Sequence, residues 1–338
     1  MKYKLAKPLS IHELGQRKNQ EDSIFPKLGA ATENDRLFIL CDGMGGHEAG
    51  EVASQAVCQT MSDHILSQAD AEGVFTESMF NDALQAAYDS LDEKDNAEDA
   101  KKMGTTMTFV KFHAGGCMVA HIGDSRIYHI RPSEKEILYV SRDHSLVRDL
   151  YELGEITWEE MKTSKQKNII TRAMQPHQPK RAKADVRNIT DIRPGDYFFM
   201  CSDGMLEEME DNNLLNILSD DKTSDEEKVY ILTEVSKDSR DNHSAHLIHV
   251  LEVEDDEQEP VSDVASEPVA ETPAEDAVTP APKSVSQTIS RTAVPEDGPV
   301  SKKGSTFSKI LKVAVFLVLL FALIYFVVLY FLNGGEAA

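Results

Sequence analysis

The chain has 338 residues, which is enough for one large domain or two domains of ordinary size. Its formal net charge of −23 at pH 7 argues against binding to nucleic acid through a basic surface. The four cysteines stand singly within apolar runs, so no C-x-x-C spacing suggests a zinc site or a redox dithiol.

Strand and helix patterns are mixed over the first 253 residues. The strand-like segments, which are apolar or rich in β-branched and aromatic residues, are 36–42, 103–112, 117–131, 196–203 and 245–253. The helix-like segments are 47–66, 143–162 and 224–237. Gly154 interrupts the second helical segment, and Ser224 and Glu227 form a capping box at the start of the third. These patterns predict a mixed α and β domain with several antiparallel strands.

The composition changes after residue 253. Residues 254–308 are rich in Pro, Glu, Ala, Ser and Thr and carry many more acidic than basic side chains. Low hydrophobicity combined with high net charge does not offset the entropy cost of ordering a chain. We therefore expect a folded domain at residues 1–253, followed by a disordered, acidic, proline-rich linker.

Residues 309–332 form a predicted transmembrane helix. Val313–Leu332 is a run of 20 uncharged residues rich in Val, Leu and Phe, enough to cross a bilayer core of ~30 Å. Several lysines precede this run, and only Glu336 follows it, in the short tail 333–338. By the positive-inside rule we expect a single-pass protein of the inner or plasma membrane, with the folded domain in the cytoplasm.

Acidic residues recur where the predicted strands begin or end. An Asp-Gly pair after a strand is usually only a turn. Here the pair occurs twice, and the acidic residues that flank strand-like runs are Asp42, Asp203, Glu21, Asp22, Asp124 and Asp241. If these carboxylates converge in one cleft, a hard divalent cation would offset their repulsion, because Mg²⁺ and Mn²⁺ prefer oxygen ligands. Gly43 lacks a Cβ and could bring its carbonyl oxygen close to such an ion.

A site of this kind predicts phosphoryl chemistry. Two divalent ions ~3.5–4 Å apart activate a bridging water as a hydroxide nucleophile and stabilise an in-line phosphoryl displacement. Such a site also needs a fixed cation for the phosphate oxygens. Arg17 is the candidate, because it lies four residues before Glu21 and a guanidinium binds phosphate in bidentate fashion.

Eight sequence blocks carry a family resemblance over about residues 8–253. They are "GQRKNQEDS", "LFILCDGMGGHEAGEVAS", "GTTMT", "HIGDSRIYHIR", "SRDHSLVRDLYELGEIT", "NIITRAM", "GDYFFMCSDGMLEEM" and "DNHSAHLI". In this order they resemble the metal-dependent (type 2C, PPM) Ser/Thr protein phosphatases, and in particular the bacterial branch. The resemblance implies an α+β fold, a four-layer α-β-β-α sandwich of two antiparallel sheets flanked by helices.

The resemblance also implies a site with two core Mn²⁺ or Mg²⁺ ions and a weaker third ion. Asp42 would bridge the two core ions, the Gly43 carbonyl would bind one of them, and Asp203 and Asp241 would complete their coordination. Glu21 and Asp22 would hold metal-bound waters, Arg17 would bind the substrate phosphate, and Asp124 would help to hold the third ion. The segment from about 144 to 183 matches a mobile flap beside the cleft.

Two positions depart from common family patterns. Many eukaryotic members carry a histidine directly after the first Asp-Gly pair as a candidate general acid, whereas this chain has Met44, as the bacterial pattern does. The acid for the leaving group is therefore open, with metal-bound water or His47 as candidates. Glu207 stands where an Asp or Asn is common, and we expect this change to have little effect.

Other patterns in the sequence are weaker. The loop "GMGGHEAG" does not fit the dinucleotide pattern G-x-G-x-x-G, because Glu48 occupies the last position. His243, His246 and His249 suggest a metal cluster, but three-residue spacing on a strand sends successive side chains to opposite faces. We therefore interpret them as surface and packing histidines.

The predicted function is hydrolysis of phosphoserine and phosphothreonine in proteins by a membrane-tethered enzyme with a monomeric catalytic domain. Its expected partners are phosphorylated proteins, including Ser/Thr kinases and their substrates, and the membrane, but not nucleic acid. Two alternatives stay open at this point. One is a catalytically inactive scaffold that binds phosphoproteins, and the other is a phosphomonoesterase that acts on small molecules.

Overall fold

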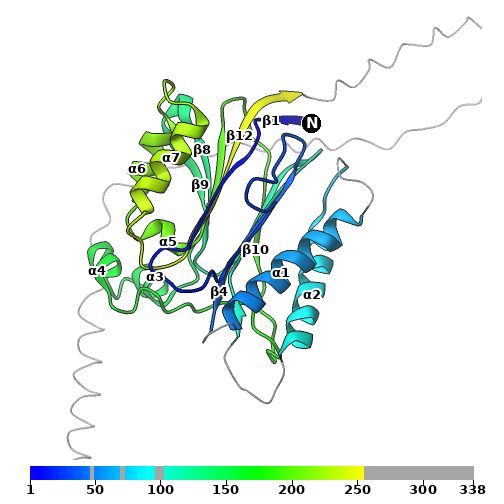
Figure 1. Cartoon of the computed structure of the whole chain (residues 1–338), viewed down its shortest axis with the longest axis vertical. Helices are drawn as coiled ribbons and strands as arrows, with labels where there is room; N and C mark the ends of the chain where they lie inside the picture. Colours follow the sequence, from blue (N-terminus) through cyan, green and yellow to red (C-terminus); the bar gives the residue numbers. More distant parts are fainter. Residues whose placement is uncertain (46–48, 69–72, 96–102, 255–338) are drawn as a thin grey trace, which may run out of the picture. The chain divides into compact units, whose positions relative to one another are not determined.

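The computed structural model describes residues 1–45, 49–68, 73–95 and 103–254 (Figure 1). Apart from Glu254, the predicted linker, transmembrane helix and tail lie outside the described residues, and so do His47 and Glu48. Within the described ranges, no helix is long and apolar enough to cross a membrane.

Two antiparallel sheets form the centre of the fold. In the first sheet the strand order is β1 (Lys2–Leu5), β12 (His243–Glu254), β11 (Tyr197–Cys201), β8 (Arg126–Arg131) and β9 (Glu136–Val140), with β2 (Leu9–Glu13) also paired to β12. In the second sheet the order is β10 (Asp185–Ile189), β7 (Gly116–Ile122), β6 (Met107–His113), β4 (Leu37–Met44) and β3 (Asp22–Phe25), with β5 (Gly104–Thr105) also paired to β4.

Helices cover the outer face of each sheet (Figure 1). The second sheet is covered by α1 (Ala49–Leu66) and α2 (Glu77–Lys94). The first is covered by α5 (Asp203–Leu206), α6 (Asp211–Leu218) and α7 (Asp225–Ser236). Between β9 and β10 the chain forms α3 (Leu146–Glu152) and α4 (Trp158–Thr163), and the short 3₁₀ helix η1 (Pro132–Glu134) joins β8 to β9. The predicted four-layer α-β-β-α sandwich is confirmed.

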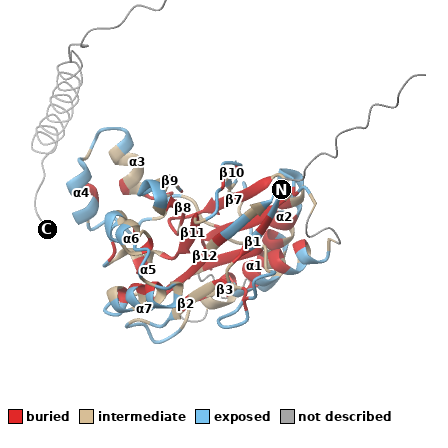
Figure 2. Cartoon of the chain, turned by 90° about the horizontal axis from the view of Figure 1, so that it is seen from above, coloured by how far each residue is buried: buried red, intermediate tan, exposed pale blue. Residues whose placement is uncertain are grey.

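The apolar runs of the two Asp-Gly strands follow from this layering. In β4, Phe38 and Leu40 pack between the sheets, whereas Ile39 and Cys41 pack against α1 and α2. Because both faces are covered, every residue from Leu37 to Cys41 is buried, and the segment shows no polar alternation. Figure 2 shows the same contrast for the whole domain, with buried strands inside and exposed residues mainly on the helices and loops.

Smaller sequence predictions are also met. Ser224 and Glu227 form the capping box of α7, and Gly154 has φ +70° between α3 and α4. Of the three spaced histidines, His246 packs beside Phe38 between the sheets, while His249 contacts Asp225 on α7, so they do not form one cluster. The packing interpretation is confirmed for His243 and His246, which are buried because the sheets are covered on both faces, and His249 is half-buried.

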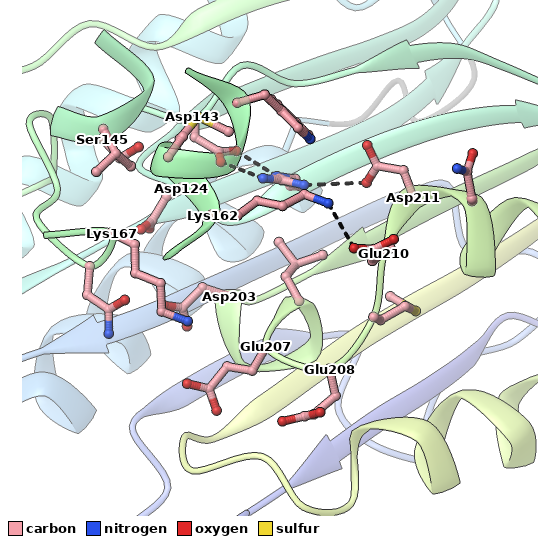
Figure 3. A pocket seen from close by; sticks show the side chains of 18 residues that line it. Asp124, Asp143, Ser145, Lys162, Lys167, Asp203, Glu207, Glu208, Glu210 and Asp211 are labelled. Atoms are coloured by element: carbon pink, nitrogen blue, oxygen red, sulfur yellow. Dashed lines mark hydrogen bonds and ion pairs between the residues drawn. The ribbon is translucent and has the colours of Figure 1, made fainter. Parts of the chain in front are cut away.

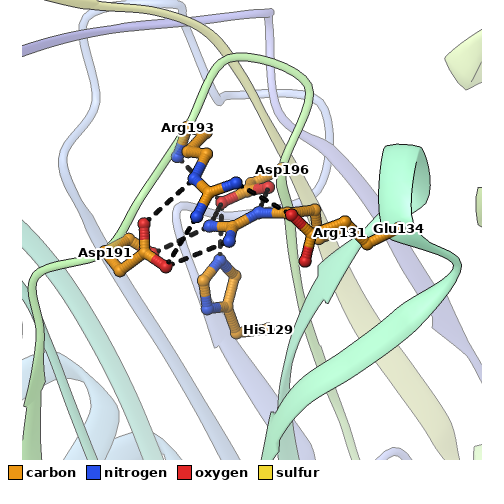
Figure 4. Close-up of polar contacts among 6 residues, drawn as sticks. All are labelled: His129, Arg131, Glu134, Asp191, Arg193 and Asp196. Carbon is orange, nitrogen blue, oxygen red and sulfur yellow. Dashed lines mark hydrogen bonds and ion pairs between the residues drawn. The ribbon is translucent and has the colours of Figure 1, made fainter.

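A buried ion network closes the end of the first sheet where β8 runs into η1 (Figure 4). Arg131, with 2% of its side chain exposed, donates to both carboxylate oxygens of Asp196 at 2.8 Å, and His129 Nε2 lies 2.8 Å from Oδ2 of the same residue. Burial alone would raise the pKa of Asp196, but the hydrogen bonds from Arg131 and His129 outweigh it and lower this pKa to about 2. Asp191, Arg193 and Glu134 extend the network to the surface.

Candidate functional site

Asp42 and Asp22 lie directly opposite each other on β4 and β3. The backbone of Asp42 is held by the neighbouring strand: its N–H donates to Thr106 Oγ1 at 3.0 Å, and its carbonyl accepts from Thr106 N at 2.8 Å. Thr105 Oγ1 donates to the same carbonyl at 2.9 Å. Three hydrogen bonds with Thr105 and Thr106 of the "GTTMT" segment therefore fix the backbone position of Asp42.

Both glycines of the Asp-Gly pairs are required by close backbone packing. A Cβ on Gly43 would lie 2.2 Å from the carbonyl oxygen of Gly50 and 2.5 Å from that of Glu21. A Cβ on Gly204 would lie 2.1 Å from the carbonyl oxygen of Asn242. The end of β4 and the start of α5 thus pack tightly against the first turn of α1 and the loop before β12, which gathers their aspartates in one place.

The structure brings the predicted acidic residues together. Asp203 is the first residue of α5, and its carboxyl group interacts with that of Asp42. Asp241, in the turn before β12, and Asp124, in the β7–β8 turn, both interact electrostatically with Asp42. Glu21 precedes β3 and interacts with Asp241.

Burial and mutual repulsion disfavour the charged forms of these carboxyls. The pKa of Asp22 rises to about 7, mainly through burial and in spite of hydrogen bonds from Ser244 and Ser202. The pKa of Asp203 rises to about 6 through burial and the charge of Asp241. Burial, followed by neighbouring carboxylates, raises the pKa of Asp42 and Asp124 well above the ordinary range. In the metal-free domain the cluster is therefore unfavourable when fully ionised.

Unsatisfied oxygen atoms indicate what would relieve this cluster. Asp22 Oδ1, Asp124 Oδ1 and Asp203 Oδ1 are buried and have no hydrogen-bond partner within the described part of the chain. Buried polar atoms are nearly always satisfied, so three orphaned carboxylate oxygens in one place fit an oxygen-coordinated divalent cation. Among the described residues, the three side chains whose possible metal-ligand atoms all lie within 4.8 Å of one another are His121, His144 and Asp185.

Arg17 lies at the open side of the acidic cluster. Its guanidinium forms an ion pair with Asp241, and 51% of its side chain is exposed. Burial would lower the pKa of Arg17, but Asp241, Glu21 and Asp42 raise it, so the guanidinium stays protonated and positively charged. A partly exposed cation beside half-buried carboxylates suits the binding of an incoming anion such as a phosphate.

Two residues that position this cluster were missed in the sequence. Asn242 accepts from Glu21 N at 2.8 Å and donates to the carbonyls of Leu14 and Asn19, so it ties the Arg17 loop to the turn that carries Asp241. Ser202 donates to Asp22 Oδ2 at 2.9 Å and accepts from Ser244 N at 2.9 Å. Their only sequence signal is that each one adjoins a predicted metal ligand.

A cavity of about 600 Å³ opens beside the cluster (Figure 3). Asp124 and Asp203 lie at its inner side, and its walls come from the α3–α4 segment and from the α5–α6 segment. Two of the cations that line it are already paired, Arg126 with Asp143 and Lys162 with Glu210. Glu207, also in the wall, accepts from Arg240 N at 2.8 Å and from Ser239 Oγ at 3.3 Å, and so supports the loop before Asp241.

Comparison with known proteins places this site in a family. The model of the protein phosphatase 2C family matches residues 14–252. The chain belongs to the protein phosphatase 2C family. All the acidic residues gathered above, together with Arg17, lie inside the matched region.

Relatives of this protein phosphatase 2C chain carry consistent names. It is 34% identical over 203 residues to the serine/threonine protein phosphatase PstP of Mycobacterium tuberculosis, covering 60% of this chain and 36% of PstP. It is 33% identical over 219 residues to a putative protein phosphatase 2C-type protein of Streptococcus pyogenes, covering 63% of this chain and 85% of that protein. The match to PstP thus spans about a third of that relative.

Solved structures share the fold. The crystal structure of M. tuberculosis PstP/Ppp aligns with a TM-score of 0.63 at 30% identity, over 74% of this chain and 100% of that one. The PstP catalytic domain in complex with two manganese ions aligns with a TM-score of 0.59 at 28% identity, over 73% of this chain and 99% of that one. Protein phosphatase 2C domains use divalent metals, in agreement with the orphaned oxygens found here.

Met44 occupies the end of β4 in this protein phosphatase 2C domain and pairs with Gly104 of β5. A thioether carries no exchangeable proton, so Met44 cannot protonate a leaving group. His47, the other sequence candidate, lies outside the described residues. The flap predicted at about 144–183 corresponds to α3, α4 and the chain leading into β10.

Proposed function

We propose that this chain hydrolyses phosphoserine and phosphothreonine in proteins with the help of bound Mn²⁺ or Mg²⁺. The observation that carries the proposal is the partly buried acidic cluster, with three orphaned carboxylate oxygens, beside the exposed guanidinium of Arg17. The names of the relatives support proteins as the substrate class.

Within this proposal, the residues that would hold the two core ions are Asp42, Asp203, Asp241 and the carbonyl of Gly43. Asp124 would hold a third ion, and Glu21 and Asp22 would support the coordination from the β3 side. The bound ions supply an activated water and compensate the charge of the phosphate. Arg17 would bind the phosphate oxygens and orient the phosphoryl group. The adjoining cavity of about 600 Å³ gives room for residues next to the phosphorylated one.

The test is metal-dependent phosphate release from a phosphothreonine peptide by the full-length chain. We expect activity with Mn²⁺, loss of activity with excess chelator, and loss of activity in Asp42→Asn with the fold retained by circular dichroism. Full activity of Asp42→Asn, or no release under any metal condition, would refute the proposal. The ratio of kcat/KM for phosphopeptides to that for small phosphate esters separates a protein phosphatase from a phosphomonoesterase.

We also propose that residues 309–332 tether this activity to the inner or plasma membrane, with the catalytic domain in the cytoplasm. The support is the uncharged run Val313–Leu332 and the lysines before it, both outside the described residues. A tether raises the effective concentration of the domain near membrane-bound kinases and their substrates. After cell fractionation, we expect the full-length chain with the membranes and a truncation at residue 308 in the soluble fraction. Full-length protein in the soluble fraction alone would refute the tether.

A further inference from the structure

His144 makes two hydrogen bonds to the residue directly before Asp124. Its backbone N–H donates to the carbonyl of Gly123 at 2.9 Å, and the N–H of Gly123 donates to the ring Nδ1 at 3.0 Å. Only 1% of the His144 side chain is exposed. The Gly123–Asp124 turn is therefore held directly by the first residue of the flap.

The hydrogen bonds define the protonation state of this ring. An amide N–H can only donate, so Nδ1 must carry a bare lone pair and the single ring proton sits on Nε2. Burial, followed by the neighbouring His121, lowers the pKa of His144 to about 4, which keeps the ring neutral at neutral pH. Nε2–H then donates to Asp185 Oδ2 at 3.2 Å.

This orientation connects the turn to the base of the flap. Asp185, the first residue of β10, also pairs with the guanidinium of Arg172. The carbonyl of His144 accepts from Thr171 N at 2.8 Å. His144 thus links the Gly123–Asp124 turn to the C-terminal part of the flap, which contains Thr171, and to Asp185, which follows it.

The same ring geometry argues against a metal ion among His121, His144 and Asp185. The two imidazoles stack with centroids 4.5 Å apart and planes 11° apart, so their in-plane lone pairs run parallel and do not converge on one point. His121 Nε2 lies 2.7 Å from the Arg142 carbonyl and must donate to it, and His144 Nε2 carries its proton toward Asp185. His121 Nδ1 is buried and has no hydrogen-bond partner within the described residues, but its lone pair lies in a plane nearly parallel to the His144 ring, so the three residues do not form one coordination site.

The turn is clamped from its other side by Thr106. Gly123 has φ +111°, and a Cβ there would lie 2.5 Å from Thr106 Cγ2. Thr106 is also the residue that hydrogen bonds to the backbone of Asp42. Since Asp124 Oδ1 has no hydrogen-bond partner within the described chain, the orientation of this carboxylate depends on the turn that carries it.

We propose that His144 is a positioning residue that fixes the Gly123–Asp124 turn through Nδ1 and anchors it to the flap through Asp185, so that the flap sets the metal affinity of Asp124. The inference rests on the proposed function in one respect, the role of Asp124 as a ligand of the weaker third ion. Loss of such an outer partner typically costs 10–100-fold in metal affinity.

Two substitutions test separately the hydrogen bonds made by the two ring nitrogens of His144. The Oδ1 of His144→Asn takes the place of Nδ1 and can accept from Gly123 N–H, whereas His144→Gln reaches Asp185 and leaves the Gly123 amide without an acceptor. We measure Mn²⁺ binding to the full-length chain by calorimetry. His144→Gln should weaken the weaker binding phase about tenfold and leave the tighter phase unchanged, and His144→Asn, which keeps the acceptor for Gly123 and loses only the bond to Asp185, should weaken it less.

The outcomes distinguish the two proposals. Equal Mn²⁺ affinities for the Gln and Asn variants, or equal losses in both binding phases, would overturn the role of His144 alone. Absence of any Mn²⁺ binding by the unmodified chain would overturn the proposed function. Should the Gln variant not fold, ¹⁵N NMR of the unmodified protein decides, because a proton on Nδ1 of His144 contradicts the assignment and a bare Nδ1 supports it.

Discussion

Asp22 and Asp42 face each other as direct partners across β3 and β4, so two carboxylates that repel one another share a buried strand pair. Like charges directly opposite in a sheet are destabilising, and burial raises the pKa of both residues. A fold keeps such an arrangement only when another requirement outweighs its cost. In this domain that requirement is the site that the two residues help to build.

The first prediction is that Asp42→Asn stabilises the metal-free domain while it abolishes activity. An amide removes one buried charge but keeps the shape of the side chain, so the free energy of unfolding should rise by about 1–3 kcal/mol. Urea unfolding in the presence of chelator measures the change. Surface Asp63→Asn on α1 is the matched control and should leave both stability and activity unchanged. A less stable Asp42→Asn variant would contradict this account.

The second prediction concerns pH and metal together. The pKa values of Asp22 and Asp203 are raised to about 7 and about 6, so the metal-free fold binds protons that the unfolded chain has released. That stabilisation is complete below about pH 4 and is lost as the pH rises through 6 to 7. Mn²⁺ must displace these protons to bind. The increase in Tm produced by Mn²⁺ should therefore be larger at pH 8 than at pH 5, as measured by scanning calorimetry.

The third prediction is that Ala cannot replace either glycine of the Asp-Gly pairs. A Cβ on Gly43 or Gly204 would meet a carbonyl oxygen at 2.2 Å or 2.1 Å, and both oxygens belong to the backbone. Each substitution should cost several kcal/mol or prevent folding. Gly29→Ala is the control: its φ is +74° and nothing lies within 4 Å, so only about 1–2 kcal/mol of backbone strain is expected. Equal losses in all three variants would show that packing is not the cause.

Much of the site could be read from the sequence because its chemistry resides in residue types. Asp42, Asp203 and Asp124 each follow a strand-like run and Asp241 precedes one, and sheets that pack face to face can bring such strand ends together. Even the apolar runs of β4 and β11 are explained by burial on both faces. The recurrence of acidic residues at strand ends was therefore enough to suggest one acidic cluster, and the family resemblance supplied the role expected of each residue.

The residues that position the acidic cluster through hydrogen bonds could not be predicted from the sequence. Asn242, Ser202 and Thr106 act through hydrogen bonds to residues far away in the chain, and short polar side chains have many uses in turns and strands. The pairing of Asp22 with Asp42 depends on strand register, which a sequence does not specify residue by residue. Likewise, the role of His144 depends on which ring nitrogen meets Gly123.

The fourth prediction addresses Arg17. Its side chain is half-exposed, and within the described part of the chain it forms an ion pair with Asp241 alone, so it contributes little to stability. If it binds the substrate phosphate, Arg17→Ala should lower kcat/KM on a phosphothreonine peptide by about 100-fold while Tm changes little. The exposed neighbour Lys18, replaced by Ala, is the matched control and should keep kcat/KM. An Arg17→Ala enzyme with unchanged kcat/KM would remove this residue from the reaction.

The last prediction separates stability from activity at the far end of the first sheet. Asp196 has a pKa of about 2 because hydrogen bonds from Arg131 and His129 outweigh its burial, compared with about 3.9 in an unfolded chain. A carboxyl whose pKa is lowered on folding stabilises the protein above about pH 4, and this contribution is lost as the pH falls toward 2. Asp196→Asn should therefore reduce the free energy of unfolding by about 2–3 kcal/mol at pH 7 and by progressively less toward pH 3.

Strand β11 separates this network from Asp203 by roughly 15–20 Å, so kcat/KM at neutral pH should be unchanged. Urea unfolding at several pH values measures the stability difference, and a difference that stays constant with pH would show that the lost packing, and not the charge of Asp196, is responsible.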